Sequence, residues 1–158
     1  MTSRLIALAS DHGGYEMKEQ LKKELESWGY QILDLGTDGP ASVDYPDFAE
    51  AMAAAIRSKV ADTGVLVCGT GIGISIAVNR HPEVRAALVH DAVTARLSRE
   101  HNDANVVVFG GRVIGPEIAK DCLKVFLNTE FEGGRHARRV AKMSVPLNQP
   151  ETLPKFWD

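Results

Sequence analysis

The residues most able to take part in catalysis or ligand binding form one short segment, Cys68-Gly69-Thr70-Gly71-Ile72-Gly73. An apolar run from Val65 to Val67 leads into the cysteine, and a second apolar run begins at Ile74. This pattern predicts a buried strand, a glycine turn and a helix. Glycines let the backbone approach a ligand, and the N–H groups at a helix N-terminus attract negative charge. The same field favours the thiolate form of Cys68, so the turn could hold a base or nucleophile beside an anion site.

Two well-known glycine loops do not fit this segment. The dinucleotide loop G-x-G-x-x-G needs its third glycine one residue later than Gly73. The P-loop needs a lysine followed by serine or threonine, whereas Ser75 is followed by Ile76. A cysteine at a strand end is also often a small buried hydrophobe without a chemical role. The segment therefore predicts an anion site in an α/β protein, and both interpretations of Cys68 stay open.

The composition predicts one globular domain that works in a reducing compartment. The chain has 158 residues, 44% of them hydrophobic, which is enough for one substantial core. A formal net charge of −3 gives no electrostatic reason to expect nucleic acid or an anionic membrane as a partner. Cys68 and Cys122 lie in different predicted elements, which argues against a disulfide scaffold. No basic and apolar leader precedes the first strand and no apolar run approaches about 20 residues, so we expect a cytoplasmic protein.

Strand-like and helix-like segments alternate along the chain. The predicted strands are 5–9, 30–35, a run that ends at 68, 84–89 and 106–109. The predicted helices are 15–28, about 48–60, a segment that ends near 79, 92–100, about 116–127 and 135–143. Such alternation is typical of a parallel sheet with helices on both faces. We therefore predict a Rossmann-like, three-layer α/β sandwich with a five-stranded parallel sheet.

The predicted sheet should gather polar residues at one rim, because ligands of such folds bind beyond the carboxyl ends of the strands. The segments that follow the five strands are Ser10–Gly14, Gly36–Asp38, Cys68–Gly73, His90–Asp91 and Gly110–Arg112. The loop pairs Asp44-Tyr45 and His101-Asn102 could reach the same rim.

Three of these residues have structural alternatives. Asp11 could cap the N-terminus of the first helix instead of binding a ligand. His12 by itself indicates no more than a surface or hydrogen-bonded histidine. His101 stands at a predicted helix C-terminus, where the dipole favours protonated imidazole, and this charge complementarity alone would explain it. Together with Cys68, however, His101 supplies an acid/base group that works near neutral pH.

A second charged group stands in Glu132-Gly133-Gly134-Arg135-His136-Ala137-Arg138-Arg139. The glycine pair opens a helix, and Arg135 and Arg139 share one helical face because they are four residues apart. With Arg112 from another part of the chain, two guanidinium groups on one face would suit a phosphate. The alternative is a solvated basic face, which is the usual role of such a run.

Five motifs together give the chain a specific resemblance to a known family. They are Ser-Asp-His-x-Gly (Ser10–Gly14), Asp-Tyr-Pro (Asp44–Pro46), Cys-Gly-Thr-Gly-Ile-Gly (Cys68–Gly73), Ser-Arg-x-His-Asn-Asp (Ser98–Asp103) and Glu-Gly-Gly-Arg-His (Glu132–His136). In this order and spacing, from about Leu5 to Val145, the chain resembles the ribose-5-phosphate isomerase B family. The wider group also contains allose-6-phosphate and galactose-6-phosphate isomerases. The resemblance implies a sugar-phosphate isomerase domain, 1–146, and a C-terminal tail, 147–158.

The resemblance implies a role for each matching residue. Cys68 stands where the family has the base for the C2 proton, and Thr70 where a hydroxyl assists at the reacting carbons. His101 stands at the position of the acid/base residue that opens the furanose ring. Tyr45 lies near the base in such enzymes and would support its thiolate. The implied substrate-binding residues are Asp11, His12, Gly69, Thr70, Gly71, Ile72, Gly73, Asn102 and the phosphate ligands Arg112, Arg135 and Arg139.

One position distinguishes two branches of this family. A sister branch lacks the cysteine and uses a glutamate in the glycine turn as its base. Ile74 stands at that place and cannot accept a proton, while Cys68 is present, so the chain resembles the cysteine branch. The tail with Phe156 and Trp157 lies beyond the matched region, and it is either an unstructured tip or a cover for a neighbouring subunit.

These parts suit an aldose–ketose isomerisation that needs no metal and no cofactor. Moving a carbonyl between C1 and C2 needs a base for a carbon acid, a proton shuttle and stabilisation of an enediolate. We predict interconversion of ribose 5-phosphate and ribulose 5-phosphate, with a 6-phosphohexose such as allose 6-phosphate as the alternative substrate. Other classes remain: a thiol-dependent hydrolase that uses Cys68 with His101, and a non-catalytic phosphosugar-binding module. The resemblance also implies a homodimer, or a dimer of dimers, with active sites shared between chains.

Overall fold

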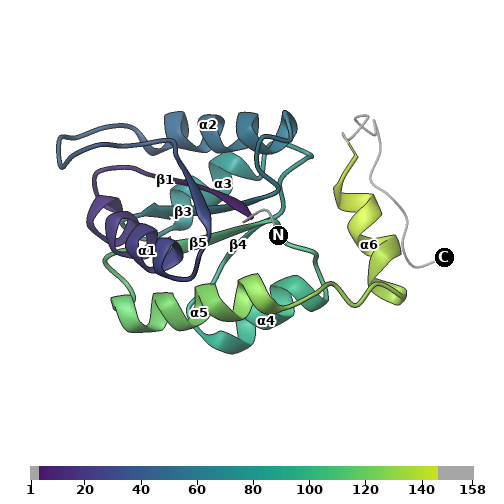
Figure 1. Ribbon diagram of the computed structural model, residues 1–158. Coiled ribbons are helices and arrows are strands. Elements are labelled where there is room, and N and C mark those ends of the chain that lie inside the picture. Colours follow the sequence, from purple (N-terminus) through teal and green to yellow (C-terminus); the bar gives the residue numbers. More distant parts are fainter. Residues whose placement is uncertain (1–3, 146–158) are drawn as a thin grey trace.

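The computed structural model describes residues 4–145, in which five strands and six helices alternate (Figure 1). The strands are β1 (Leu5–Ser10), β2 (Gln31–Asp34), β3 (Thr63–Cys68), β4 (Ala86–Leu88) and β5 (Val106–Gly110). The helices are α1 (Tyr15–Ser27), α2 (Tyr45–Arg57), α3 (Ile72–Val78), α4 (Ala92–Glu100), α5 (Pro116–Asn128) and α6 (Arg135–Met143). Of the helices in this range, none has both the length and the apolar character that a membrane span requires. The predicted tail, 147–158, lies outside the described residues.

All five strands run parallel in one sheet, in the order β2-β1-β3-β5-β4. The central strand, β3, is buried along its whole length, as its continuous apolar run predicts. Cys68 pairs with Gly110 at the carboxyl end of the sheet, and Gly64 pairs with Val106 at the amino end. The chain moves to one side from β1 to β2 and to the other side for β3, so the loops after β1 and β3 diverge around a crevice. This crevice is where the fold is expected to bind a ligand.

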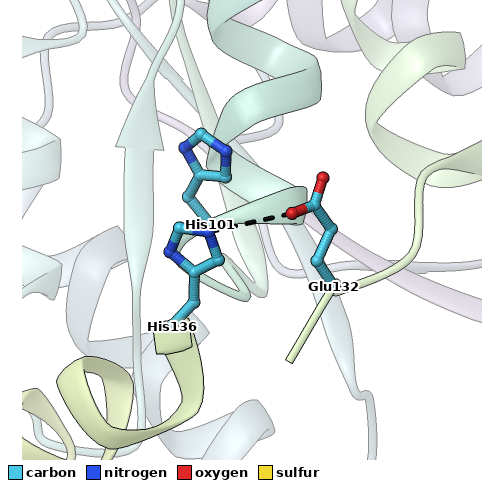
Figure 2. A group of neighbouring side chains, drawn as sticks. All are labelled: His101, Glu132 and His136. Carbon is cyan, nitrogen blue, oxygen red and sulfur yellow. Dashed lines mark ion pairs between the residues drawn. The ribbon is translucent and has the colours of Figure 1, made fainter. Parts of the chain in front are cut away.

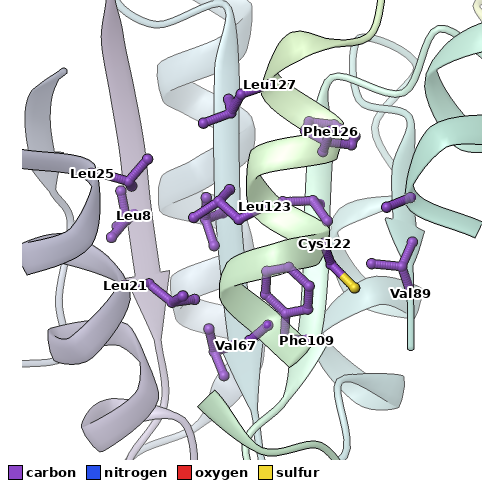
Figure 3. Close-up of a cluster of buried hydrophobic side chains, with 14 of the residues drawn as sticks. Leu8, Leu21, Leu25, Val67, Val89, Phe109, Cys122, Leu123, Phe126 and Leu127 are labelled. Atoms are coloured by element: carbon purple, nitrogen blue, oxygen red, sulfur yellow. The ribbon is translucent and has the colours of Figure 1, made fainter. Parts of the chain in front are cut away.

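Helices cover both faces of the sheet and form two hydrophobic cores. On one face, residues of α1, α4 and α5 pack against β3 and β5; this cluster includes Leu21, Leu25, Val67, Ala95, Phe109, Leu123 and Phe126 (Figure 3). On the other face, residues of α2 and α3 pack against the same strands; this cluster includes Ala49, Met52, Ala53, Leu66, Ile74, Val78 and Val108. The predicted three-layer α/β sandwich with a five-stranded parallel sheet is confirmed.

Two elements differ most from the sequence prediction: α2 begins and ends about three residues earlier, and β4 is shorter at both ends. α2 begins at Tyr45 and not near residue 48, because Asp44 and Pro46 form its N-terminus, and proline is favoured in a first helical turn. β4 is shorter than predicted, and it is the edge strand with β5 as its neighbour. At the start of β4 a side chain bonds to the backbone: the N–H of Ala86 donates to Asn79 Oδ1 at 2.8 Å. The earlier start of α2 brings Tyr45 beside the Cys68 turn.

The last helix, α6, lies apart from the two helix layers and beyond the amino ends of the strands (Figure 1). The N–H of Glu132 donates to the carbonyl of Glu100 at 3.1 Å, which ties the segment before α6 to the end of α4. Arg85, just before β4, donates from Nη1 to Ser144 Oγ at 3.3 Å. The exposed arginines of α6 therefore stand at the amino edge of the sheet.

Candidate active site

The turn after β3 aims a backbone donor at the sulfur of Cys68. Cys68 is buried, and the N–H of Gly71 donates to its Sγ at 3.1 Å. A thiolate accepts such a bond more strongly than a thiol does, because the thiol sulfur is a weak acceptor. Helix α3 begins at the next residue, Ile72. The strand, glycine turn and helix predicted around Cys68 are therefore present.

Gly71 is required by the geometry of this turn. Its φ is +77°, in the left-handed region that residues with a side chain rarely adopt. A Cβ atom there would lie 2.5 Å from Leu88 Cδ1 and 3.0 Å from the carbonyl oxygen of Phe109. An added methyl group would therefore displace the turn that carries the donor to Cys68.

We expect Gly71→Ala to destabilise the protein and to lower its activity. The left-handed backbone alone should reduce the free energy of unfolding by about 1–2 kcal/mol. Gly39→Ala is the matched control, because nothing lies within 4 Å of a Cβ at Gly39. Denaturant unfolding of both variants measures the difference. Equal stability of the two would contradict the role given to Gly71.

The turn after β1 holds Asp11 and His12 in place by hydrogen bonds. Asp11 is buried, and its Oδ1 accepts from the N–H of Gly14 at 3.1 Å. The N-cap position of α1 is Gly14, so Asp11 does not occupy the predicted cap position; its carboxylate caps the turn that leads into the helix. The Nδ1 atom of His12 accepts from the N–H of Val43 at 3.2 Å, which assigns the ring proton of neutral His12 to Nε2 and leaves that atom for a ligand.

The turn after β5 brings Arg112 to the Cys68 turn. The N–H of Gly111 donates to the carbonyl of Cys68 at 2.9 Å, and that of Arg112 donates to the carbonyl of Gly69 at 2.9 Å. The guanidinium lies over Gly69, where a Cβ atom would be 3.2 Å from Arg112 Nη1. A cavity of about 490 Å³, lined in part by His12 and Arg112, opens beside these turns. Its lining offers an imidazole and a guanidinium to an anion, with the carboxylate of Glu16 also in the lining.

Tyr45 completes what we call the carboxyl-edge group. Its ring lies against Gly73, where a Cβ atom would be 2.6 Å from Tyr45 Cζ. The carboxyl-edge group comprises Asp11, His12, Tyr45, Cys68–Gly73 and Arg112. The structure thus brings together residues of three strand-end turns with Tyr45, which was predicted to reach this rim from a loop.

The other two strand-end turns have structural roles. Asp91 Oδ1 accepts from the N–H of Thr94 at 2.7 Å and so caps α4. After β2, the N–H of Ser10 donates to the carbonyl of Gly36 at 2.7 Å, and the N–H of Thr37 donates to the carbonyl of Ser10 at 2.8 Å. These bonds extend the pairing of β1 with the β2 segment. Neither turn adds a functional group to the carboxyl-edge group.

His101 and Asn102 lie at the opposite edge of the sheet from Cys68. α4 begins after the carboxyl end of β4 and runs back along the sheet, so its C-cap, His101, precedes the amino end of β5. Cys68 pairs with the last residue of β5, and the five residues of that strand span about 16 Å. The expectation that His101 and Asn102 reach the same rim as Cys68 is therefore wrong within one chain.

At the amino edge, His101 meets a second histidine from α6. The rings of His101 and His136 stack with 4.3 Å between centroids and 15° between planes (Figure 2). Glu132 Oε2 lies 3.7 Å from His136 Nε2. Burial is the main cause that lowers the pKa of His136, and the charges of His101, Arg135 and Arg139 lower it further, while Glu132 opposes them. These causes favour the neutral form of His136.

The predicted phosphate ligands of α6 stand beside this histidine pair. Arg135 and Arg139 are exposed on α6. Asn102 lines a cavity of about 400 Å³ between the start of β4 and α6. We call His101, Asn102, Arg135, His136 and Arg139 the amino-edge group. The candidate site residues thus fall into two groups at opposite edges of the sheet.

The cluster of His101, Glu132 and His136 is poorly arranged for a metal ion. Their ligand atoms lie within 4.8 Å of one another. Tetrahedral coordination requires the lone pairs of both imidazoles, which lie in the ring planes, to converge on one point. The two stacked planes instead run nearly parallel, and Glu132 is exposed. The arrangement favours ring–ring contact over shared coordination.

Two residues of this cluster had no role in the sequence interpretation. His136 and Glu132 both lie in the last of the five motifs, but the basic residues around them drew attention to phosphate binding. A signal was present, since His136 and Val140 are four residues apart and are the buried residues of an otherwise basic helix. The stacking partner, His101, could not be read from that spacing.

Comparisons with known proteins agree with this fold and these motifs. A family model described as Ribose/Galactose Isomerase matches residues 6–143. Ribose-5-phosphate isomerase B of Escherichia coli is 42% identical over 135 residues, which cover 85% of this chain and 91% of that protein. A ribose 5-phosphate isomerase structure from Thermotoga maritima has a TM-score of 0.88 and 48% identity, covering 89% of this chain and 97% of that one. The ribose-5-phosphate isomerase B structure from Clostridium thermocellum has a TM-score of 0.87 and 48% identity, covering 89% and 95%.

The matched range contains both the carboxyl-edge and the amino-edge groups. It begins in β1, before Asp11, and ends at the last residue of α6, after Arg139. The similarity therefore extends over the whole segment that carries the candidate site. By sequence over this range and by fold, the chain belongs to the Ribose/Galactose Isomerase family, which confirms the resemblance read from its motifs.

Proposed function

We propose that the protein interconverts ribose 5-phosphate and ribulose 5-phosphate through an enediolate. The observation that carries the proposal is the Cys68 sulfur, buried at the carboxyl edge with the N–H of Gly71 at 3.1 Å. A pentose phosphate is supported by relatives that are named for ribose 5-phosphate. The family description also names galactose, so a 6-phosphohexose such as allose 6-phosphate is the alternative substrate.

The proposed reaction begins with ring opening and moves one proton between two carbons. His101 exchanges protons with the ring oxygen and O1, which opens the furanose to the aldehyde. The Cys68 thiolate then removes the C2 proton; the C–H electron pair forms the C1=C2 bond, and the carbonyl pair moves to O1. Backbone N–H groups from Gly69 to Gly73 stabilise the resulting enediolate, and Thr70 assists proton movement between O1 and O2. Return of the proton from Cys68 to C1 leaves the ketone at C2.

A complete site on this scheme requires two chains. The base belongs to the carboxyl-edge group, whereas His101 and two phosphate-binding arginines belong to the amino-edge group, about 16 Å away along β5. We propose a homodimer in which the carboxyl-edge group of one chain faces the amino-edge group of the other, or a dimer of such dimers. Exposed Ile72 and Ile76, beside the Cys68 turn, support a covered surface there, since they are 55% and 66% exposed in one chain.

A cytoplasmic location is proposed because the chemistry assigned to Cys68 suits a reducing compartment. Cys68 and Cys122 are both free and buried. Free thiols persist in a reducing compartment, and the proposed chemistry requires Cys68 to stay unoxidised.

The decisive experiment is an isomerase assay over pentose 5-phosphates and hexose 6-phosphates. We expect the highest kcat/KM with ribose 5-phosphate. A higher value with allose 6-phosphate would select the alternative substrate. Binding of every sugar phosphate without turnover would favour a phosphosugar-binding module. A covalent adduct at Cys68 with an acyl or phosphoryl substrate would favour a hydrolase.

Exhaustive chelation is expected to leave this activity unchanged. The proposed steps use a thiolate, an imidazole and backbone donors, and the stacked rings of His101 and His136 do not converge on an ion. Activity is measured after treatment with EDTA and removal of the chelator. A loss that one divalent ion restores would contradict the proposal that no metal takes part.

A further inference from the structure

We propose that His136 is a positioning residue: its buried imidazole stacks on the His101 ring and holds that ring in place for proton transfer to the sugar. The inference rests on the proposed function, in which His101 opens the furanose ring. His136 itself need not touch the substrate, because it acts through the ring on which it packs (Figure 2).

The ring of His101 needs an external support. His101 is the C-cap of α4, where a helix frays easily, and its backbone N–H donates to the carbonyl of Leu97 at 2.9 Å. Among residues 4–145, neither ring nitrogen of His101 takes part in a hydrogen bond. Its stack with His136 is a contact that holds the ring plane. Both nitrogens stay available for a substrate.

His136 is well placed to give that support. It is 7% exposed, and its backbone N–H donates to the carbonyl of Gly133 at 3.0 Å. The N–H of Glu132 donates to the carbonyl of Glu100 at 3.1 Å, directly before His101. The segments that carry the two rings are thus joined by a backbone hydrogen bond. This joint holds the two rings in register.

The charges around His136 favour its neutral imidazole. His101, from the end of α4, and Arg135 and Arg139, from α6, all disfavour its cationic form, as does burial, which is the main cause of its lowered pKa. Glu132 is the neighbouring group that favours the cation. A neutral His136 can stack on His101 whether or not His101 holds a proton. Two cations at 4.3 Å would repel each other instead.

Two assays separate ring opening from carbon chemistry. Turnover of ribose 5-phosphate begins from a closed furanose and needs His101. Ribulose 5-phosphate cannot close this ring, because its O5 carries the phosphate, so exchange of its C1 proton with D₂O needs Cys68 without ring opening. The ratio of the two rates therefore reports on His101 and is insensitive to how much folded enzyme is present.

His136→Ala is expected to lower ribose 5-phosphate turnover about 10- to 100-fold, since small misplacements of a reacting group cost this much. The C1 exchange of ribulose 5-phosphate should stay within about threefold, so the ratio of the rates changes. His136→Phe keeps a flat ring without nitrogen and should restore most of the turnover. Val140→Ala is the matched control, because it removes packing from the same buried face of α6 and leaves the stack. It should change both rates by the same factor.

Two outcomes would overturn the role of His136. Equal losses in both assays for His136→Ala would mean that the residue only docks α6. A Phe variant as slow in ring opening as the Ala variant would mean that a nitrogen of His136 acts in the chemistry. If the wild-type protein neither turns over ribose 5-phosphate nor exchanges the C1 proton, the proposed function fails, and that result is distinct from both.

Discussion

Cys68→Ala is expected to lose about 10²- to 10⁴-fold in kcat, the range typical for loss of a general base. The variant should still bind the sugar phosphate, because the arginines and the backbone donors of the glycine turn remain. Cys68 is 4% exposed and packs in the core below the turn, so the smaller alanine fits there without a clash. The loss should therefore be chemical, with little change in KM.

Proton exchange at carbon distinguishes loss of the base in Cys68→Ala from a general loss of folding or binding. The variant should bind ribulose 5-phosphate but no longer exchange its C1 proton with D₂O, and no C2 proton of ribose 5-phosphate should be released. Exchange near the wild-type rate would contradict the assignment of Cys68 as the base. The search would then turn to Asp11, the buried carboxylate of the carboxyl-edge group.

Cys122→Ala is the matched control for loss of a thiol. Cys122 lies in α5 within the core that faces α1, and burial raises its pKa to about 11. It is a protonated thiol at neutral pH and cannot serve as a base there. We expect normal kcat and a packing cost of about 1 kcal/mol in the free energy of unfolding.

The fold could be predicted from the sequence because each strand carries a strong local signal. The apolar run before Cys68 gave the central strand, and the alternation of strands with helices gave the parallel sheet. The ligand rule for parallel sheets then gathered Asp11, His12 and Arg112 around the Cys68 turn. These residues directly follow strands, so the direction of each strand is enough to predict the edge of the sheet at which they lie.

The place of His101 was missed although a simple rule gives it. A helix that follows a parallel strand runs back along the sheet, so its C-terminus returns to the amino edge. Grouping His101 with Cys68 by chemical type overlooked this direction. The stack of His101 on His136 is different, because 35 positions of sequence separate the rings and no local pattern joins them. Only the docking of α6 onto the end of α4 brings them together.

Two inactive variants with changes at opposite edges of the sheet are expected to restore activity when they share a dimer. One chain carries Cys68→Ala in its carboxyl-edge group, and the other carries Arg135→Ala and Arg139→Ala in its amino-edge group. In a twofold dimer, one site of the hybrid combines both defects and the other combines two intact groups. With equal amounts of the two chains, half of the dimers are hybrids with one working site of two, so about one quarter of wild-type activity should return.

A second mixture tests the assignment of residues to edges. Cys68→Ala and Arg112→Ala both change the carboxyl-edge group, since Arg112 lies over Gly69. Every site of their hybrid dimer then contains one defect, and no activity should return. Chains with two different affinity tags allow hybrids to be isolated and their formation to be verified. Hybrids that form without restored activity in the first mixture would place the whole site in one chain. Restoration in both mixtures would instead separate Arg112 from the Cys68 site, contrary to the backbone bonds that join their turns.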